Sequence, residues 1–186
     1  HPNEKSGFCI SLSDLISEKR DSIGIFAVSV RGADRIAEKH IKTGDDCNAL
    51  LVKSLADRLA EAASEWLHRE TRKKIWGYAP DENLSIEELR QCKYQGIRPA
   101  VGYPSIPDQS ILFELDKILD LRQIGITLTE NGAMSPASSI CGLYISHPKS
   151  FYFMVGEIGE DQLNDYAKRR NMQPDKLRKF LSCRCS

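Results

Sequence analysis

The sequence predicts a single α+β domain with a mainly antiparallel, twisted sheet, a long central helix and flanking helices. Three observations lead to this prediction. Residues 46–75 have the apolar spacing of one long helix, other apolar runs are short enough for strands, and strands do not alternate strictly with helices. The chain has 186 residues, 41% of them hydrophobic, so residues 1–186 suffice for one compact core.

The first predicted elements are a strand and a helix. Residues 22–30 contain an apolar run that is typical of a buried strand. Gly32 then begins a turn, and residues 33–42 have the pattern of a helix.

The strongest local pattern is the long helix over 46–75. Apolar residues recur along it at helical spacing, with charged residues between them. At 1.5 Å per residue this helix is about 45 Å long. We expect it to pack across the sheet through four apolar side chains, which are Leu51, Leu55, Leu59 and Trp66.

The sequence pattern in the second half of the chain predicts short helices and strands. Ser85 and Glu88 have the spacing of a capping box, which indicates a helix start. The segment His147–Ser150 has the composition of a hairpin turn, so the strands on either side should pair antiparallel. The predicted helices cover 86–92, 111 to before Gly125, 161–170 and 174–181, and the predicted strands cover 126–129, 140–146 and 151–158.

Composition excludes several classes of function. The 26 basic residues balance 26 acidic ones, which argues against a nucleic-acid binder or a protein that binds anionic membranes. No apolar run approaches the roughly 20 residues of a spanning helix, and the first residues lack the pattern of a secretory signal. We therefore expect a cytoplasmic protein with no membrane partner.

The six cysteines and four histidines do not have the spacing of a metal site. Phosphate-loop, nucleophile-elbow and zinc-protease motifs are also lacking, so we assign no catalytic residue and no metal. We expect free thiols in a reducing compartment. The cysteines are Cys9, Cys47, Cys92, Cys141, Cys183 and Cys185.

The segment Gln95–Pro104 carries the most chemical information. Proline follows both Arg98 and Tyr103, which favours an extended backbone at each, and Gly102 permits a close backbone approach. Such a loop presents a guanidinium for a carboxylate and a phenol ring for a planar base or a cation. S-adenosylmethionine contains a carboxylate, a planar base and a positively charged centre, so it would fit such a loop. The alternative is a surface turn in which Arg98 makes an ordinary ion pair.

Several motifs occur in an order that resembles a known family. They are Ser54–Ala62, Trp76–Leu84, Tyr94–Ala100, Gly102–Pro104 and Ser146–Pro148. Together they resemble the C-terminal activation domain of cobalamin-dependent methionine synthase, and the resemblance extends from about Phe8 to about Leu181.

The resemblance implies a function in enzyme reactivation. In that family the domain binds S-adenosylmethionine and presents its methyl group to cobalamin held by a neighbouring cobalamin-binding domain. Oxidised cob(II)alamin is returned to methylcobalamin by reductive methylation, with one electron from flavodoxin or a related flavoprotein. The chain would then be a module of a methyltransferase in methionine biosynthesis, and not a complete catalyst alone.

The resemblance also implies ligand contacts. Arg98 matches the arginine that holds the methionine carboxylate, and Ala100 and Tyr103 match neighbouring contact positions. Tyr152 and Phe153 match two aromatic residues that are usually both tyrosines. Phe153 could equally be a core residue of a strand, since alternate strand positions face the core.

The sequence also departs from the family pattern. The family domain is longer, and an acidic residue that pairs with the ligand ammonium lies in the part upstream of His1. The segment 108–111 and Ser135 also differ from the family. A second hypothesis is therefore a relative without the ligand, which docks on a corrinoid domain or a flavoprotein.

Overall fold

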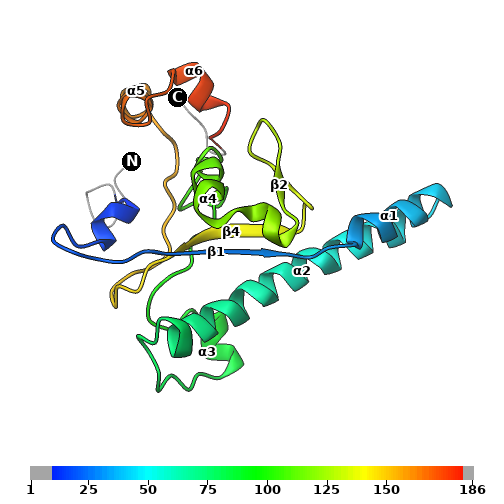
Figure 1. The fold of residues 1–186 in the computed structure, drawn as a ribbon, viewed down its shortest axis with the longest axis horizontal. Helices are drawn as coiled ribbons and strands as arrows, with labels where there is room; N and C mark the ends of the chain where they lie inside the picture. The colour runs from blue at the N-terminus through cyan, green and yellow to red at the C-terminus, as the bar shows by residue number, and fades with distance from the viewer. Residues whose placement is uncertain (1–9, 182–186) are drawn as a thin grey trace.

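The computed structural model describes residues 10–181. Helices and strands follow one another along the chain without a break into separate units (Figure 1). The elements are η1 (Leu12–Leu15), β1 (Gly24–Ser29), α1 (Ala33–Lys42), α2 (Asp46–Glu70), η2 (Thr71–Ile75), α3 (Ile86–Arg90), α4 (Ile111–Leu119), η3 (Leu121–Ile124), β2 (Thr127–Leu128), β3 (Met134–Ser135), β4 (Ser139–Tyr144), α5 (Glu160–Arg169) and α6 (Pro174–Arg178).

The central sheet is antiparallel, as the sequence predicts. Strand β1 pairs with β4, with Gly24 opposite Tyr144 and Ser29 opposite Ser139. The segment 97–101 follows the other edge of β4 through two isolated bridges, Ile97 with Ile145 and Ala100 with Gly142. Strand β4 therefore has a partner on both of its edges.

The core lies on both faces of this sheet, because alternate residues of a strand point to opposite sides. Ile25 and Ala27 of β1 pack towards a cluster that contains Leu112 and Leu115 of α4. Phe26 packs on the other face against Ala60 of α2 and neighbouring residues. The sheet is thus enclosed by α4 and η3 on one side and by α2 on the other.

Helix α2 forms as predicted, but its packing differs from the expectation. Its buried residues are mostly small, and they are Ala49, Ala56, Ala60, Ser64 and His68. Leu51, Leu55, Leu59 and Trp66, which we expected on the sheet, are 53% to 61% exposed. Helical spacing identifies stripes on a helix but does not determine which stripe meets the sheet. Small side chains allow the helix to approach the sheet closely, and here they form the contact.

The predicted strand over 151–158 is wrong. This segment has no ladder with β4, because β1 and residues 97–101 already occupy both edges of β4. It crosses instead to the C-terminal helices, and the Val155 N–H donates to the Pro104 carbonyl at 3.0 Å. The predicted strand over 126–129 is confirmed only as β2, which pairs with β3 in a separate small sheet.

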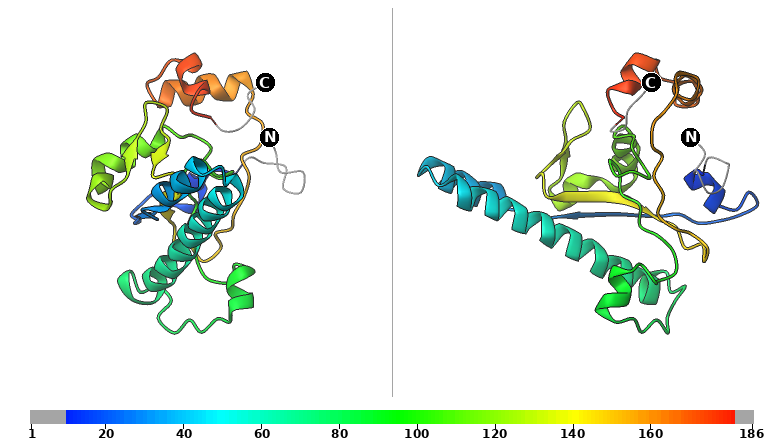
Figure 2. Two further views of the ribbon diagram at one scale, coloured as in Figure 1. Left: turned by 90° about the vertical axis from the view of Figure 1, so that its right-hand side faces the viewer. Right: turned by 180° about the vertical axis from the view of Figure 1, so that it is seen from behind.

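The C-terminal helices α5 and α6 pack on each other through Leu163, Ala167 and Leu177. Tyr166 of α5 donates to buried Asp108 at 2.7 Å, which ties α5 to the segment before α4. These helices and α3 lie at opposite ends of the molecule in every view (Figure 2). Among residues 10–181, no helix is both long and apolar enough to cross a membrane.

Candidate functional site

The candidate site begins with the segment that carries Arg98. Backbone hydrogen bonds join Ile97 to Ile145 at 2.9 and 3.0 Å, so this segment runs directly beside the strand. Glycine is needed for this approach. A Cβ at Gly96 would lie 2.6 Å from the Ile145 carbonyl oxygen, and a Cβ at Gly142 would lie 2.7 Å from the Ala100 Cα. The segment therefore holds the Arg98 backbone against the sheet.

The Arg98 guanidinium faces two carboxylates of helix α2. One terminal nitrogen donates to Glu65 Oε2 at 3.1 Å, and the other lies 3.9 Å from Glu61 Oε2. Tyr103 donates from its hydroxyl to Glu61 Oε1 at 2.6 Å. The Arg98 side chain is only 18% exposed, so these charges lie partly out of water. We name Glu61, Glu65, Arg98 and Tyr103 the ionic cluster.

The protonation states of this cluster are set by burial and by neighbouring charges. Burial acts to lower the pKa of Arg98, but Tyr152 and Glu65 outweigh it and the pKa is raised. Burial and the contact with Glu61 raise the pKa of Tyr103 to about 12. Arg98 is therefore charged and Tyr103 neutral at physiological pH.

A second layer, whose side chains are largely buried, adjoins the ionic cluster. Arg72 donates twice to Glu82, at 2.6 and 2.8 Å, and its guanidinium carbon lies 4.2 Å from the centre of the Tyr94 ring. His68 stacks on Tyr144, and its ring meets Tyr94 edge-on. Burial, with the charges of Arg72 and Arg98, lowers the pKa of His68 to about 2. His68 is therefore neutral.

The change of helix type at the end of α2 helps to place this layer. Residues Thr71–Ile75 form a π-turn, in which the Trp76 N–H donates to the Thr71 carbonyl five residues earlier. Single π-turns inside helices are common at functional sites. Here the turn contains Arg72, whose side chain is completely buried.

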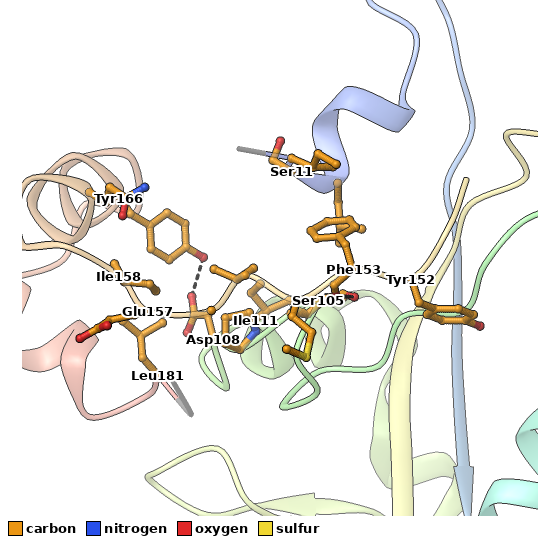
Figure 3. A pocket seen from close by; sticks show the side chains of 18 of the residues that line it. Ser11, Ser105, Asp108, Ile111, Tyr152, Phe153, Glu157, Ile158, Tyr166 and Leu181 are labelled. Carbon is orange, nitrogen blue, oxygen red and sulfur yellow. Dashed lines mark hydrogen bonds between the residues drawn. The ribbon is translucent and has the colours of Figure 1, made fainter. Parts of the chain in front are cut away.

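Tyr152 joins the 151–158 segment to the site. Its hydroxyl accepts a hydrogen bond from the Arg98 backbone N–H at 3.0 Å and lies 3.2 Å from the Tyr94 hydroxyl. Figure 3 shows Tyr152 turned towards the sheet, whereas Phe153 points towards the segment that carries Ser11. Adjacent residues of this segment therefore face different environments.

Phe153 faces a large, mostly apolar hollow of about 1020 Å³ (Figure 3). This hollow lies between the 151–158 segment, residues 10–12, the start of α4 and helix α5. Phe153 itself is buried beside Leu15, Ile97 and Ile145. Its environment agrees with the core alternative that the sequence left open.

The structure thus brings three of the five predicted ligand residues together. Arg98 and Tyr103 both contact Glu61, and Tyr152 contacts Arg98. Ala100 is buried against the sheet, where it forms a bridge with Gly142 and packs in the cluster that contains Phe26 and Ala60. The ligand contacts assigned to all five residues stay predictions.

Sequence reasoning missed the residues that surround Arg98 on the helix side. Four ionisable residues of α2 and η2 follow one another at spacings of four, three and four positions, so they lie on one stripe of the helix. An unbroken stripe of ionisable residues beside a small-residue face was the signal that could have found them. The stripe consists of Glu61, Glu65, His68 and Arg72.

Within the described range, no group of three or more metal-ligating side chains gathers. Cys47, Cys92 and Cys141 are free thiols. Cys9, Cys183 and Cys185 lie outside the described residues.

The fold and the ionic cluster define an α+β domain that holds opposed charges, partly buried, between its sheet and its longest helix. Sequence comparison matches residues 1–171 to the family described as vitamin B12 dependent methionine synthase, activation domain. Since this match covers most of the chain, the chain belongs to that family, as the sequence motifs predict.

The structure is also similar to a solved one described as the crystal structure of the MetH reactivation domain bound to AdoHcy. The TM-score is 0.82 at 44% sequence identity, and the similarity covers 88% of this chain. It covers 51% of the other chain, so this chain spans about half the length of that solved domain.

Proposed function

We propose that this chain binds S-adenosylmethionine and serves as the reactivation module of a cobalamin-dependent methionine synthase. The observation that carries this proposal is the ionic cluster, in which Arg98 opposes Glu61 and Glu65. The solved relative bound to AdoHcy supports the same ligand class, because AdoHcy differs from S-adenosylmethionine only by the transferred methyl group.

The charged groups of the ionic cluster match the amino-acid end of S-adenosylmethionine, which carries a carboxylate and an ammonium. A guanidinium binds a carboxylate with two parallel hydrogen bonds, and a carboxylate binds an ammonium or a sulfonium. Among the described residues, Arg98 Nε and Glu65 Oε1 are buried polar atoms without a hydrogen-bond partner. Glu65 Oε1 is nevertheless ion-paired, since a terminal nitrogen of Arg72 lies 3.9 Å away. Arg98 Nε therefore has an unused donor for a ligand carboxylate.

Binding would exchange ion pairs instead of leaving a charge unpaired. A ligand carboxylate on Arg98 replaces the Glu65 contact, and Glu65 then faces the ligand ammonium. This exchange matters because an uncompensated charge in a partly buried site is costly. Tyr103, which is neutral and bonded to Glu61, adds a ring that can face the sulfonium.

We further propose that the ligand methyl group is directed to cobalamin on the neighbouring domain. Bound to that domain and reduced by one electron from a flavodoxin-like protein, cobalamin would supply the nucleophile that accepts the methyl group. The chain itself contributes position and orientation, since the sulfonium is already a reactive methyl donor. This assignment requires no general acid or base from the chain. We also propose that the module works in the reducing cytoplasm.

Isothermal titration of the purified chain with S-adenosylmethionine tests the proposal. We expect saturable binding with one ligand per chain, and competition by AdoHcy. The carboxamide of AdoHcy, which differs from AdoHcy only by loss of the carboxylate charge, should compete much more weakly. An absence of binding to both S-adenosylmethionine and AdoHcy would contradict the proposal.

The docking hypothesis has one observation in its favour. The exposed stripe of Leu51, Leu55, Leu59 and Trp66 is apolar surface without a partner among the described residues. If docking is the function, the chain binds a cobalamin domain or a flavoprotein whether or not the ligand is present. Changes in the ionic cluster should then leave that binding unaltered.

A further inference from the structure

We propose that Tyr94 is a positioning residue for the ligand site, acting on Arg98 through the hydroxyl of Tyr152. The proposal rests on the function proposed above. It concerns a buried residue that is outside the ionic cluster and is joined to it through Tyr152.

Arg98, Tyr152, Tyr94 and Cys92 can form a chain of hydrogen bonds in which each group donates to the next. The Arg98 N–H donates to the Tyr152 hydroxyl at 3.0 Å, and the Tyr152 and Tyr94 hydroxyls lie 3.2 Å apart. The Tyr94 hydroxyl also lies 3.5 Å from Cys92 Sγ, which can accept. When Tyr152 donates to Tyr94 and Tyr94 donates to Cys92, every hydroxyl has a partner. Tyr152 is then oriented to accept from Arg98.

Tyr94 is well fixed for this purpose. Its ring lies under the Arg72 guanidinium at 4.2 Å, and the His68 ring meets it edge-on with centroids 5.0 Å apart. Arg72 is in turn held by two hydrogen bonds from its side chain to Glu82. Burial raises the pKa of Tyr94, so its hydroxyl remains a donor throughout the physiological range.

The same buried layer also reaches the acidic side of the cluster. A terminal nitrogen of Arg72 lies 3.9 Å from Glu65 Oε1. Arg72 and Tyr94 thus contact the two groups that carry the opposed charges, Glu65 directly and Arg98 through Tyr152. Binding groups need support of this kind, because a displacement of about 1 Å costs much of their effect.

A double-mutant cycle tests this role. The variants are Tyr94→Phe, Tyr152→Phe and the double variant, each titrated with S-adenosylmethionine. We expect Tyr94→Phe to weaken binding by about three- to tenfold, the range for one hydrogen bond. In the Tyr152→Phe background, Tyr94→Phe should have no further effect, because the residue through which it acts has lost its hydroxyl.

Tyr78→Phe is the matched control. Tyr78 is also partly buried beside the same histidine, with its hydroxyl 3.3 Å from His68 Nε2, and among the described residues no hydrogen bond joins it to Tyr152 or Tyr94. Removing this hydroxyl should change binding by less than about twofold, although urea unfolding should find it destabilised about as much as Tyr94→Phe. A merely structural role for Tyr94 would weaken binding equally in both variants.

The outcomes separate the two proposals. If the parent chain binds neither S-adenosylmethionine nor AdoHcy, the proposed function fails, and the role of Tyr94 fails with it. If the parent binds and Tyr94→Phe binds equally well, only the positioning role is overturned. The positioning role is also overturned if the effects of Tyr94→Phe and Tyr152→Phe add independently in the double variant.

Discussion

Helix α2 has two faces that differ in an unexpected way. The face against the sheet carries small residues such as Ala56, Ala60 and Ser64, whereas the opposite face carries exposed leucines and Trp66. The larger apolar side chains are therefore not the buried ones. Burial along this helix follows the space that the sheet leaves, and small side chains let the backbone of α2 come close to Phe26 and Ile140.

This close approach also serves the site. The ionisable stripe of α2 adjoins the small-residue face, so the helix that packs tightly on the sheet also brings Glu61 and Glu65 to Arg98. Among residues 10–181, the leucine face makes no ion pair or hydrogen bond with Arg98, and its side chains are exposed. Changes on the two sides of α2 should therefore have very different consequences.

The largest expected effect is at the site. Arg98→Ala should weaken S-adenosylmethionine binding by about 30- to 1000-fold, or roughly 2 to 4 kcal/mol, since it removes a charge-assisted, partly desolvated contact. Arg98→Lys should restore binding only in part, because an ammonium lacks the two-pronged geometry. Titration calorimetry measures both effects. Arg90→Ala, at an exposed position, is the control and should leave the affinity unchanged. Unchanged affinity in Arg98→Ala would show that the ligand does not bind at this site.

The small-residue face can be tested by overpacking. Ala60→Leu should destabilise the fold by about 1 to 3 kcal/mol, because Ala60 is buried where α2 contacts the sheet. Ala62 lies two residues further along on an exposed part of the helix. Ala62→Leu should change stability by less than about 0.5 kcal/mol. Equal losses in urea unfolding would contradict the packing of α2.

The buried layer predicts a pH dependence of stability. The pKa of His68 is about 2 when folded, against an ordinary value of 6.5, so the unfolded chain binds a proton that the folded chain does not. Stability is complete above pH 6.5 and falls as the pH decreases. The expected loss between pH 7 and pH 5 is about 2 kcal/mol.

Urea unfolding at the two pH values measures this loss. His68→Gln should be less stable at pH 7 but should lose the dependence between pH 7 and pH 5. His40→Gln is the control variant, because His40 is a partly exposed histidine paired with Asp45. It should keep the loss of stability between pH 7 and pH 5. A parent chain that is equally stable at both pH values would show that His68 is not kept neutral by burial.

The smallest effect is expected on the leucine face. Leu55→Ala should change the free energy of unfolding of the chain by less than about 0.5 kcal/mol, because the leucine is already exposed. A loss above about 2 kcal/mol is typical of a buried leucine. Such a loss would mean that another molecule covers this face in solution, and sedimentation analysis would identify a second copy of the chain.

Local structure was predictable where it depends on neighbouring residues. The capping box forms as predicted, with Ser85 N–H donating to Glu88 at 2.9 Å and Glu88 N–H donating to the Ser85 hydroxyl. The predicted limits of 33–42 agree with α1. In contrast, the hydrophobic pattern of 151–158 was correct for an extended segment but did not show that β4 had no free edge.

The sequence by itself therefore determined the helices, the positions of the two strands that form the central sheet, and the segment in which Arg98 and Tyr103 lie. These features depend on residues within a few positions of one another, through helical spacing, caps and turns. The tertiary structure decided which face of α2 is buried and which side chains meet Arg98. Glu65 is 33 residues and Tyr152 is 54 residues from Arg98 along the chain, so only the packing of helix, sheet and loop could bring them together.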